Sequence, residues 1–326
     1  MRTSACKRVS MMEPRMKLIA EGLRFPEGPI WLDDGSLLVV EIRARCLTRI
    51  RPDGRREVVA QLGGGPNGAA IGPDGACYVC NNGGFDWHDM PDGTVRPGLQ
   101  PTDYSGGRIE RVDLATGEVR VLYTHSDRGP LRGPNDIVFD AAGGFWFSDI
   151  GKRRPRDGDH GGVYYARIDG SHCREAVFPM TTPNGVGLSP DGRRLYVAET
   201  TTGRLWAFAV VAPGQLGRDP ASQATHGGTL VAGVGGYQLF DSLAVEADGT
   251  VCVATLFNGG ITRIAADGSR VEHRPLPDAF TTNLCFGGPG LRTAYVTLSS
   301  TGRLVALDWP QAGLRPAFDD RAPLND

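Results

Sequence analysis

A short pattern of two apolar runs joined by a tight polar turn repeats along the chain and limits the folds it can adopt. An Asp-Gly pair between alternating apolar runs, as in WLDDGSLLVVEI and IGPDGACYVC, is a strong signal for a β-hairpin. The pattern divides the sequence into six units, which begin with EGPIW, PNGAAI, PNDIVF, PNGVGL, FDSLAV and TTNLCF. The units recur at intervals of about 40 to 70 residues and each holds up to four strand-like runs, which is typical of a β-propeller.

The two ends of the repeat explain how such a ring would close. The sixth unit ends after LVALDW and lacks an outermost strand, which the early segment MKLIAEG can supply. Closure removes the open sheet edges that a propeller must avoid. We therefore expect an all-β, six-bladed β-propeller with four antiparallel strands per blade, closed by an N-terminal strand. The expected division is a disordered extension over 1–15, a single domain over 16–312 and a short tail over 313–326.

Charge and cysteine usage narrow the class of protein. The chain has 326 residues and a formal net charge of -2, which gives no electrostatic case for binding nucleic acid or an anionic membrane. No apolar run approaches the length of a membrane span, and the basic N-terminus lacks the apolar core of a secretory signal. Seven cysteines, an odd number scattered among apolar positions, favour free thiols in a reducing cytoplasm. The sequence leaves the oligomeric state open.

One position recurs just before the apolar part of each innermost strand, and every unit places an oxygen-bearing side chain there. The set is Glu27, Asn67, Asn135 followed by Asp136, Asn184, Asp241 and Asn283. Because the first strand of each blade lines the central channel, these side chains should meet at one mouth of it. Asn and Asp before a strand can also simply cap a turn. Carboxylate and amide oxygens are the ligands that Ca²⁺ prefers, and Glu27 with Asp241 would neutralise a divalent ion.

Two long polar inserts, residues 83–106 and 151–160, interrupt the second and third units. Long loops on a rigid scaffold often carry binding groups, although plain surface loops would look the same. Aromatic rings suit sugar rings, and arginines suit a carboxylate or an array of hydroxyls. The candidates for contact with a substrate are Phe85, Trp87, His88, Tyr104, Arg153, Arg154, Arg156 and His160. The alternatives are solvent-exposed histidines and a solvated arginine cluster.

The segments FPEGPIW, RGPNDIVFD, PNGVGLSPDG, FDSLAVEADG and TTNLCFGG together resemble the gluconolactonase, regucalcin and luciferin-regenerating-enzyme family of six-bladed propellers. The likeness runs from residue 17 to residue 309. It implies a divalent ion held by Glu27, Asn184 and Asp241, with Asn135 binding the metal or the substrate. It also implies substrate contacts from Asp136, which follows Asn135 in the family motif, and from Arg132, which lies near a substrate-binding arginine of some members.

Lactone hydrolysis agrees with these residues. A divalent cation can polarise the carbonyl and stabilise the oxyanion, and Asp241 is our candidate base for the attacking water. The chain has no GxSxG elbow, and its six histidines suggest no serine triad. We expect a cytoplasmic, metal-dependent lactonase acting on a sugar lactone of the aldonolactone type, with Ca²⁺ favoured over Zn²⁺, Mn²⁺ or Fe²⁺. The alternatives are a non-catalytic propeller with a structural calcium and a hydrolase of other esters, such as phosphotriesters.

Overall fold

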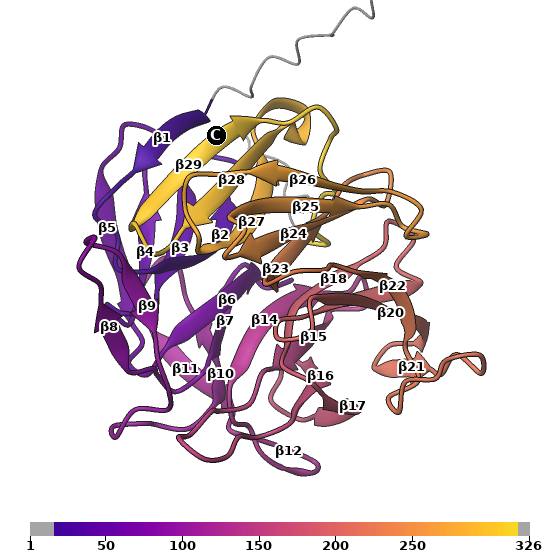
Figure 1. Cartoon of the computed structure of the whole chain (residues 1–326). Helices are drawn as coiled ribbons and strands as arrows, with labels where there is room; N and C mark the ends of the chain where they lie inside the picture. The colour runs from indigo at the N-terminus through magenta and orange to yellow at the C-terminus, as the bar shows by residue number, and fades with distance from the viewer. Residues whose placement is uncertain (1–15, 319–326) are drawn as a thin grey trace, which may run out of the picture.

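The computed structural model describes residues 16–318, and its main strands form six small antiparallel sheets arranged in a ring (Figure 1). Each sheet is one blade, with its first strand innermost. This arrangement confirms the predicted six-bladed β-propeller. Among residues 16–318, no helix combines the length and the hydropathy needed to cross a bilayer.

The first three blades follow one another along the chain and each contains four strands. Blade 1 contains β2 (Pro26–Trp31), β3 (Leu37–Glu41), β4 (Cys46–Ile50) and β5 (Arg56–Gln61). Blade 2 contains β6 (Pro66–Ile71), β7 (Cys77–Asn81), β10 (Arg108–Val112) and β11 (Val119–Tyr123). Blade 3 contains β14 (Pro134–Phe139), β15 (Gly144–Asp149), β16 (Gly161–Arg167) and β17 (Cys173–Met180). The short hairpins β8 (Trp87–Asp89) with β9 (Val95–Pro97) and β12 (His125–Ser126) with β13 (Gly129–Pro130) lie in connections.

The remaining blades complete the ring, with one departure from the predicted pattern. Blade 4 contains β18 (Pro183–Leu188), β19 (Arg194–Glu199), β20 (Arg204–Ala212), β21 (Gln215–Gly217) and β22 (Thr229–Gly233). Blade 5 contains β23 (Leu239–Val245), β24 (Val251–Leu256), β25 (Gly260–Ile264) and β26 (Val271–Pro275). Blade 6 contains β27 (Thr281–Gly287), the 3-10 helix η1 (Pro289–Leu291), β28 (Thr293–Leu298) and β29 (Arg303–Asp308). Blade 4 contains five strands, one more than predicted, because the long strand β20 pairs with both β21 and β22.

The ring is closed by the N-terminal strand, as the sequence predicts. Strand β1 (Met16–Ala20) pairs antiparallel with β29, with Met16 opposite Leu307 and Leu18 opposite Val305. In Figure 1 this brings the indigo start of the described chain beside its yellow end. The predicted extension over 1–15 and the last part of the predicted tail, 319–326, lie outside the described residues.

Glycines explain why several of the repeated motifs read Asn-Gly or Glu-Gly. The inner strands converge on the channel so closely that a side chain would strike the next blade's backbone. A Cβ atom on Gly28 would lie 2.7 Å from the carbonyl oxygen of Asn67, and one on Gly68 would lie 2.5 Å from that of Asn135. Gly185 is equally confined, with the carbonyl oxygen of Asp241 at 2.8 Å. Real Cβ contacts are longer, so these positions require glycine.

Apolar side chains from neighbouring blades fill the space between them. Tyr78 of blade 2 packs with its ring 5.1 Å from that of Phe139 and 5.8 Å from that of Phe145, both in blade 3. All three rings are buried. Such aromatic pairs stabilise the contact between blades and hold the inner strands at fixed positions around the channel.

Candidate metal and catalytic site at the channel mouth

The pairing of the inner strand with the second strand is irregular at the same place in every blade. The register shifts lie between Glu27 and Ile30, Pro66 and Ala69, Pro134 and Ile137, Pro183 and Val186, Phe240 and Leu243, and Thr281 and Asn283. A β-bulge redirects side chains and is common beside active sites. The six predicted oxygen-bearing positions therefore fall in the irregular segments, at the end of the channel where the inner strands begin.

Three carboxylates share this layer and repel one another. Burial raises the pKa of Glu27 to about 7. Burial, followed by the charge of Glu27, raises the pKa of Asp136 to about 8. The pKa of Asp241 is raised well above its usual range by burial and then by the charges of Glu27 and Asp136. Carboxylates gathered in this way are costly unless a cation neutralises them.

Asn283 and the backbone fix the orientation of the Glu27 side chain. Oε2 of Glu27 accepts a hydrogen bond from Nδ2 of Asn283 at 2.6 Å and from the amide of Gly28 at 2.5 Å. This geometry makes Asn283 a donor to the Glu27 carboxylate.

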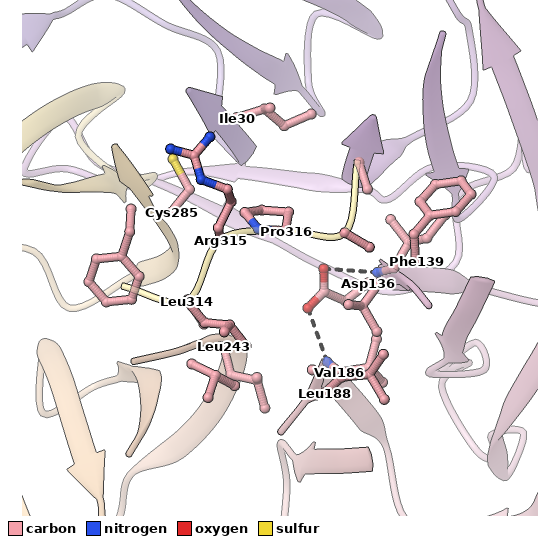
Figure 2. A pocket seen from close by; sticks show the side chains of 18 of the residues that line it. Ile30, Asp136, Phe139, Val186, Leu188, Leu243, Cys285, Leu314, Arg315 and Pro316 are labelled. Atoms are coloured by element: carbon pink, nitrogen blue, oxygen red, sulfur yellow. Dashed lines mark hydrogen bonds between the residues drawn. The ribbon is translucent and has the colours of Figure 1, made fainter. Parts of the chain in front are cut away.

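Asp136 faces an apolar cavity of about 420 Å³ that continues along the channel (Figure 2). Its Oδ1 accepts a bond from the amide of Ile137 at 3.0 Å, and its Oδ2 accepts one from the amide of Val186 at 3.1 Å. Leu314 and Phe318, from the chain segment after blade 6, line the same cavity. Both carboxylate oxygens of Asp136 are thus already bonded to the backbone.

Two amide oxygens remain open to a further partner. Oδ1 of Asn135 is buried and has no hydrogen-bond partner among residues 16–318. Nδ2 of Asn184 donates to Oγ1 of Thr200 at 3.1 Å, and its Oδ1 accepts only a long bond of 3.4 Å from Oγ of Ser242. A buried acceptor without a donor is costly, so each oxygen is a candidate ligand for a cation.

The donor set is one of mixed carboxylates and amides. Within the described part of the chain, no three His, Cys, Asp or Glu side chains form a cluster that could hold a metal ion by themselves. The candidate ligands Glu27, Asn135, Asn184 and Asp241 instead combine two carboxylates with two neutral oxygens. Such an all-oxygen set with two negative charges fits a hard divalent cation such as Ca²⁺.

In blades 1 to 4, polar residues at the end of the second strand hold the loops that lead into this site, and the sequence analysis missed them. Carboxylate or amide oxygens of these residues accept backbone N–H bonds from the loop of the same blade. The pairs are Glu41 with Arg24 at 2.7 Å, Asn81 with Gly65 at 2.8 Å, Asp149 with Gly133 at 2.7 Å and Glu199 with Thr181 at 2.8 Å. The recurring endings VVE, VCN, FSD and VAE were the signal that could have revealed them.

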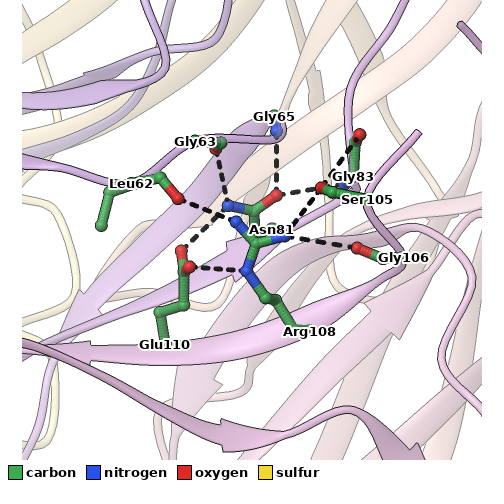
Figure 3. Close-up of polar contacts among 9 residues, drawn as sticks. All are labelled: Leu62, Gly63, Gly65, Asn81, Gly83, Ser105, Gly106, Arg108 and Glu110. Carbon is green, nitrogen blue, oxygen red and sulfur yellow. Dashed lines mark hydrogen bonds and ion pairs between the residues drawn. The ribbon is translucent and has the colours of Figure 1, made fainter. Parts of the chain in front are cut away.

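In blade 2 the polar residue at the end of the second strand, Asn81, also helps to hold the first insert in place (Figure 3). Nδ2 of Asn81 donates to Oε2 of Glu110 at 2.9 Å, and Nε of Arg108 donates to Oε1 of the same carboxylate at 2.6 Å. Arg108 also donates to Oγ of Ser105 at 3.0 Å. Asn81 accepts from the amide of Gly83 at 3.1 Å. Both ends of the insert are therefore tied to the strand that positions Asn67.

A buried lysine joins the two inserts. Lys152, in the second insert, is only 2% exposed, and its Nζ donates to Oδ1 of Asn82 at 3.1 Å and to the carbonyl of Gly84 at 2.6 Å. The same Nζ lies 4.0 Å from the ring centre of Phe85 and 5.5 Å from that of Tyr104. Burial lowers its pKa to about 7. Lys152 thus holds the inserts against each other beside the mouth.

The structure brings some of the predicted substrate residues to the mouth. Oη of Tyr104 donates to the carbonyl of Arg132 at 2.6 Å, just before Asn135. The ring of Trp87 packs 5.1 Å from that of Phe25, two residues before Glu27. The insert therefore reaches the rim on both sides of blade 2.

Other predicted contacts are placed elsewhere. His160 is exposed, and its ring lies 6.4 Å from that of Phe178 in the outermost strand of blade 3. His88 is exposed on the hairpin of the first insert. Arg154 is paired with Asp157 and Asp159 and is not open to a substrate in this arrangement.

Comparison with known proteins agrees with this fold. The family model described as SMP-30/Gluconolactonase/LRE-like region matches residues 25–300. Lactonase drp35 of Staphylococcus haemolyticus is 29% identical over 251 residues, covering 76% of this chain and 68% of the relative. Gluconolactonase of Zymomonas mobilis is 23% identical over 314 residues, covering 87% and 79%. The solved structure of a gluconolactonase from Xanthomonas campestris superposes with a TM-score of 0.70 at 24% identity, covering 91% of this chain and 90% of that chain. The chain therefore belongs to the SMP-30/gluconolactonase/LRE-like family.

Proposed function

We propose that this protein is a lactonase that hydrolyses a sugar lactone at the channel mouth with the help of a divalent cation. Its family and its relatives, named lactonase and gluconolactonase, support lactone hydrolysis. The observation that carries the proposal is the layer of mutually repelling carboxylates beside the open amide oxygens of Asn135 and Asn184. The layer has the composition of a cation site.

The four ligands have distinct roles in this proposal. Glu27 and Asp241 would supply the negative charge, and Asn135 and Asn184 would supply neutral oxygens. A divalent cation held there supplies polarisation of the lactone carbonyl and stabilisation of the oxyanion. The bond from Asn283 keeps Oε2 of Glu27 in place.

Asp241 is the proposed general base. Asp241 is partly exposed, whereas Glu27 is buried. Asp241 would take the proton from water as the water oxygen attacks the carbonyl carbon. The ring C–O bond then breaks, and the leaving oxygen takes up the proton held by Asp241, which restores the base.

The substrate would lie against the rim built by the first insert. Trp87 and Tyr104 present rings on this side, and Arg132 is exposed just before Asn135. Both carboxylate oxygens of Asp136 are bonded to backbone amides, so we assign this residue an electrostatic role in place of the predicted substrate contact. We also place the protein in the cytoplasm, because the buried Cys46, Cys77, Cys80, Cys173 and Cys252 are free thiols.

Hydrolysis of a panel of γ- and δ-aldonolactones, followed by proton release in a pH-stat, tests this proposal. We expect at least one member to open faster than in buffer alone, with an acceleration proportional to protein concentration. A matched panel of aryl esters and phosphotriesters serves as the comparison. Turnover of phosphotriesters without any turnover of lactones would contradict the lactonase assignment, and so would inactivity towards every compound by protein with a bound cation.

A further inference from the structure

The β8–β9 hairpin of the first insert lies across the rim of the channel. The hairpin is inserted between two strands of blade 2, but it contacts blade 6, because the amide of Val95 donates to the carbonyl of Ser300 at 3.0 Å. Arg43, which follows β3 of blade 1, forms a bidentate ion pair with Asp89 at 2.6 and 2.8 Å. These two contacts fix the hairpin over the boundary between blades 1 and 6.

Arg96 in this hairpin is a half-buried cation that makes no side-chain hydrogen bond or close ion pair among residues 16–318, although the exposed Asp92 interacts with its charge from further away. Its Nε is buried and makes no hydrogen bond, and none of the ion pairs found in the described part of the chain includes it. By contrast Arg43, Arg45 and Arg154 on the same side of the molecule each bind a carboxylate. Because Asp92 does not bond to the guanidinium, the buried Nε still lacks an acceptor, and this environment is suited to an anionic ligand.

The position of Arg96 relates it to the candidate site. Its Cζ lies 5.7 Å from the ring centre of Phe280, which directly precedes strand β27. Three residues further along, Asn283 donates to Glu27. Phe280 also packs 6.3 Å from Phe25, two residues before Glu27. Arg96 therefore packs on a wall of aromatic rings that leads into the strands carrying Asn283 and Glu27.

The wall itself shows backbone strain of the kind found at binding sites. Phe25 and Phe257 adopt left-handed backbone conformations, with φ of 59° and 66°, which side-chain-bearing residues rarely do. The ring of Phe257 packs 5.5 Å from that of Phe280 and 4.9 Å from that of Tyr237, which is 77% exposed. The strained residues thus extend an aromatic surface from blade 1 across blade 6 to blade 5.

We propose that Arg96 determines specificity by binding a carboxylate of the substrate that is remote from the lactone carbonyl. The aromatic wall would contact the sugar ring while the carbonyl faces Asp241. The preferred substrate would then be a lactone of a sugar diacid, and not a neutral aldonolactone. This inference rests on the proposed lactonase function and adds the chemical class of its substrate.

Steady-state kinetics on a matched pair of lactones tests the role of Arg96. The pair is a neutral aldonolactone and the aldarolactone in which the terminal CH₂OH is a carboxylate. We expect Arg96→Gln to lower kcat/KM for the anionic lactone about 10- to 100-fold, mostly through KM, since one charge-assisted contact is lost. The kcat/KM for the neutral lactone should change less than about threefold.

Two further variants complete the test. Arg96→Lys should retain part of the preference, because it keeps the charge and loses the planar fork. Arg120→Gln, an exposed arginine in the outermost strand of the same blade, is the matched control and should leave both values unchanged.

Equilibrium binding separates this inference from the proposed function. Calorimetric titration with the open-chain aldarate and aldonate requires no turnover. We expect the aldarate to bind wild type at least about tenfold more tightly than Arg96→Gln, with the aldonate affected much less. The same result in protein that opens no lactone would reject the lactonase function and keep the anion site. Equal losses for both ligands, or unchanged aldarate binding in folded Arg96→Gln and Arg96→Lys, would overturn the proposal.

Discussion

Replacing Asp241 with asparagine is expected to lower kcat about 10²- to 10⁴-fold, because the variant keeps the shape of the side chain and loses the proton acceptor. One of the two negative charges of the candidate cation site is lost as well. The affinity for Ca²⁺, measured by calorimetry, should therefore fall together with the rate. Turnover of a lactone in the pH-stat, at saturating Ca²⁺, separates the loss of the base from the loss of the metal.

Folding should not suffer from this change. The pKa of Asp241 is raised in the folded protein, so in the absence of metal its ionised form opposes folding at pH values above the unfolded value of 3.8. The chelated Asp241→Asn variant should consequently melt at the same temperature as chelated wild type or higher. Asp248→Asn, in an exposed turn of the same blade, is the control and should retain full activity. Wild-type turnover by Asp241→Asn would remove this residue from the mechanism.

Replacing Arg263 with methionine is expected to reduce the free energy of unfolding by about 3–5 kcal/mol, since it leaves a buried carboxylate without its cation. Glu246 is fully buried and accepts bonds from Nε and Nη2 of Arg263 at 2.8 and 2.7 Å. Nε1 of Trp309, beyond the last strand of blade 6, donates to the same carboxylate at 2.7 Å. The Glu246 carboxylate therefore links blade 5 to the residue that follows the last strand of blade 6.

Urea denaturation at neutral pH measures this effect. Arg55→Met, which removes the exposed ion pair with Asp53, is the matched control and should change stability by less than about 1 kcal/mol. A double variant that also replaces Glu246 with leucine should recover part of the loss, because no uncompensated charge is then buried. Because Glu246 follows the far end of β23, kcat of the folded protein should be nearly unchanged. A loss no larger than that of Arg55→Met would contradict this account of the Glu246 network.

Local patterns in the sequence were enough to predict the ring and its inner layer. Tight turns and alternating apolar runs are short-range signals, so the six units and the closing strand β1 could be recognised without a structure. The repeated Pro-Asn-Gly motif also has a local cause, since Gly68 and Gly185 are pressed against the next blade beside Asn67 and Asn184. This regularity is what allowed the positions of Glu27 and its counterparts to be predicted.

The environment of the layer could not be predicted, because it depends on contacts between distant segments. Nothing in the sequence around Lys152 shows that its ammonium group is buried against Asn82 and Phe85 of another blade. The neighbouring Arg154 looked equally available for a substrate and is instead paired with Asp157 and Asp159. The path of the β8–β9 hairpin over blades 1 and 6 likewise depends on tertiary contacts, which loop length and composition do not encode.

A Ca²⁺ titration of chelator-treated protein during lactone hydrolysis tests directly whether a cation in the channel layer is needed for the reaction. We expect activity to be lost on chelation, to return in proportion to added metal and to saturate at one ion per chain. Variants that replace Glu27 or Asp241 with the corresponding amide should shift this curve to higher metal concentration. Full lactonase activity in protein shown to be free of metal would contradict the claim that a cation in the channel layer is needed for the reaction.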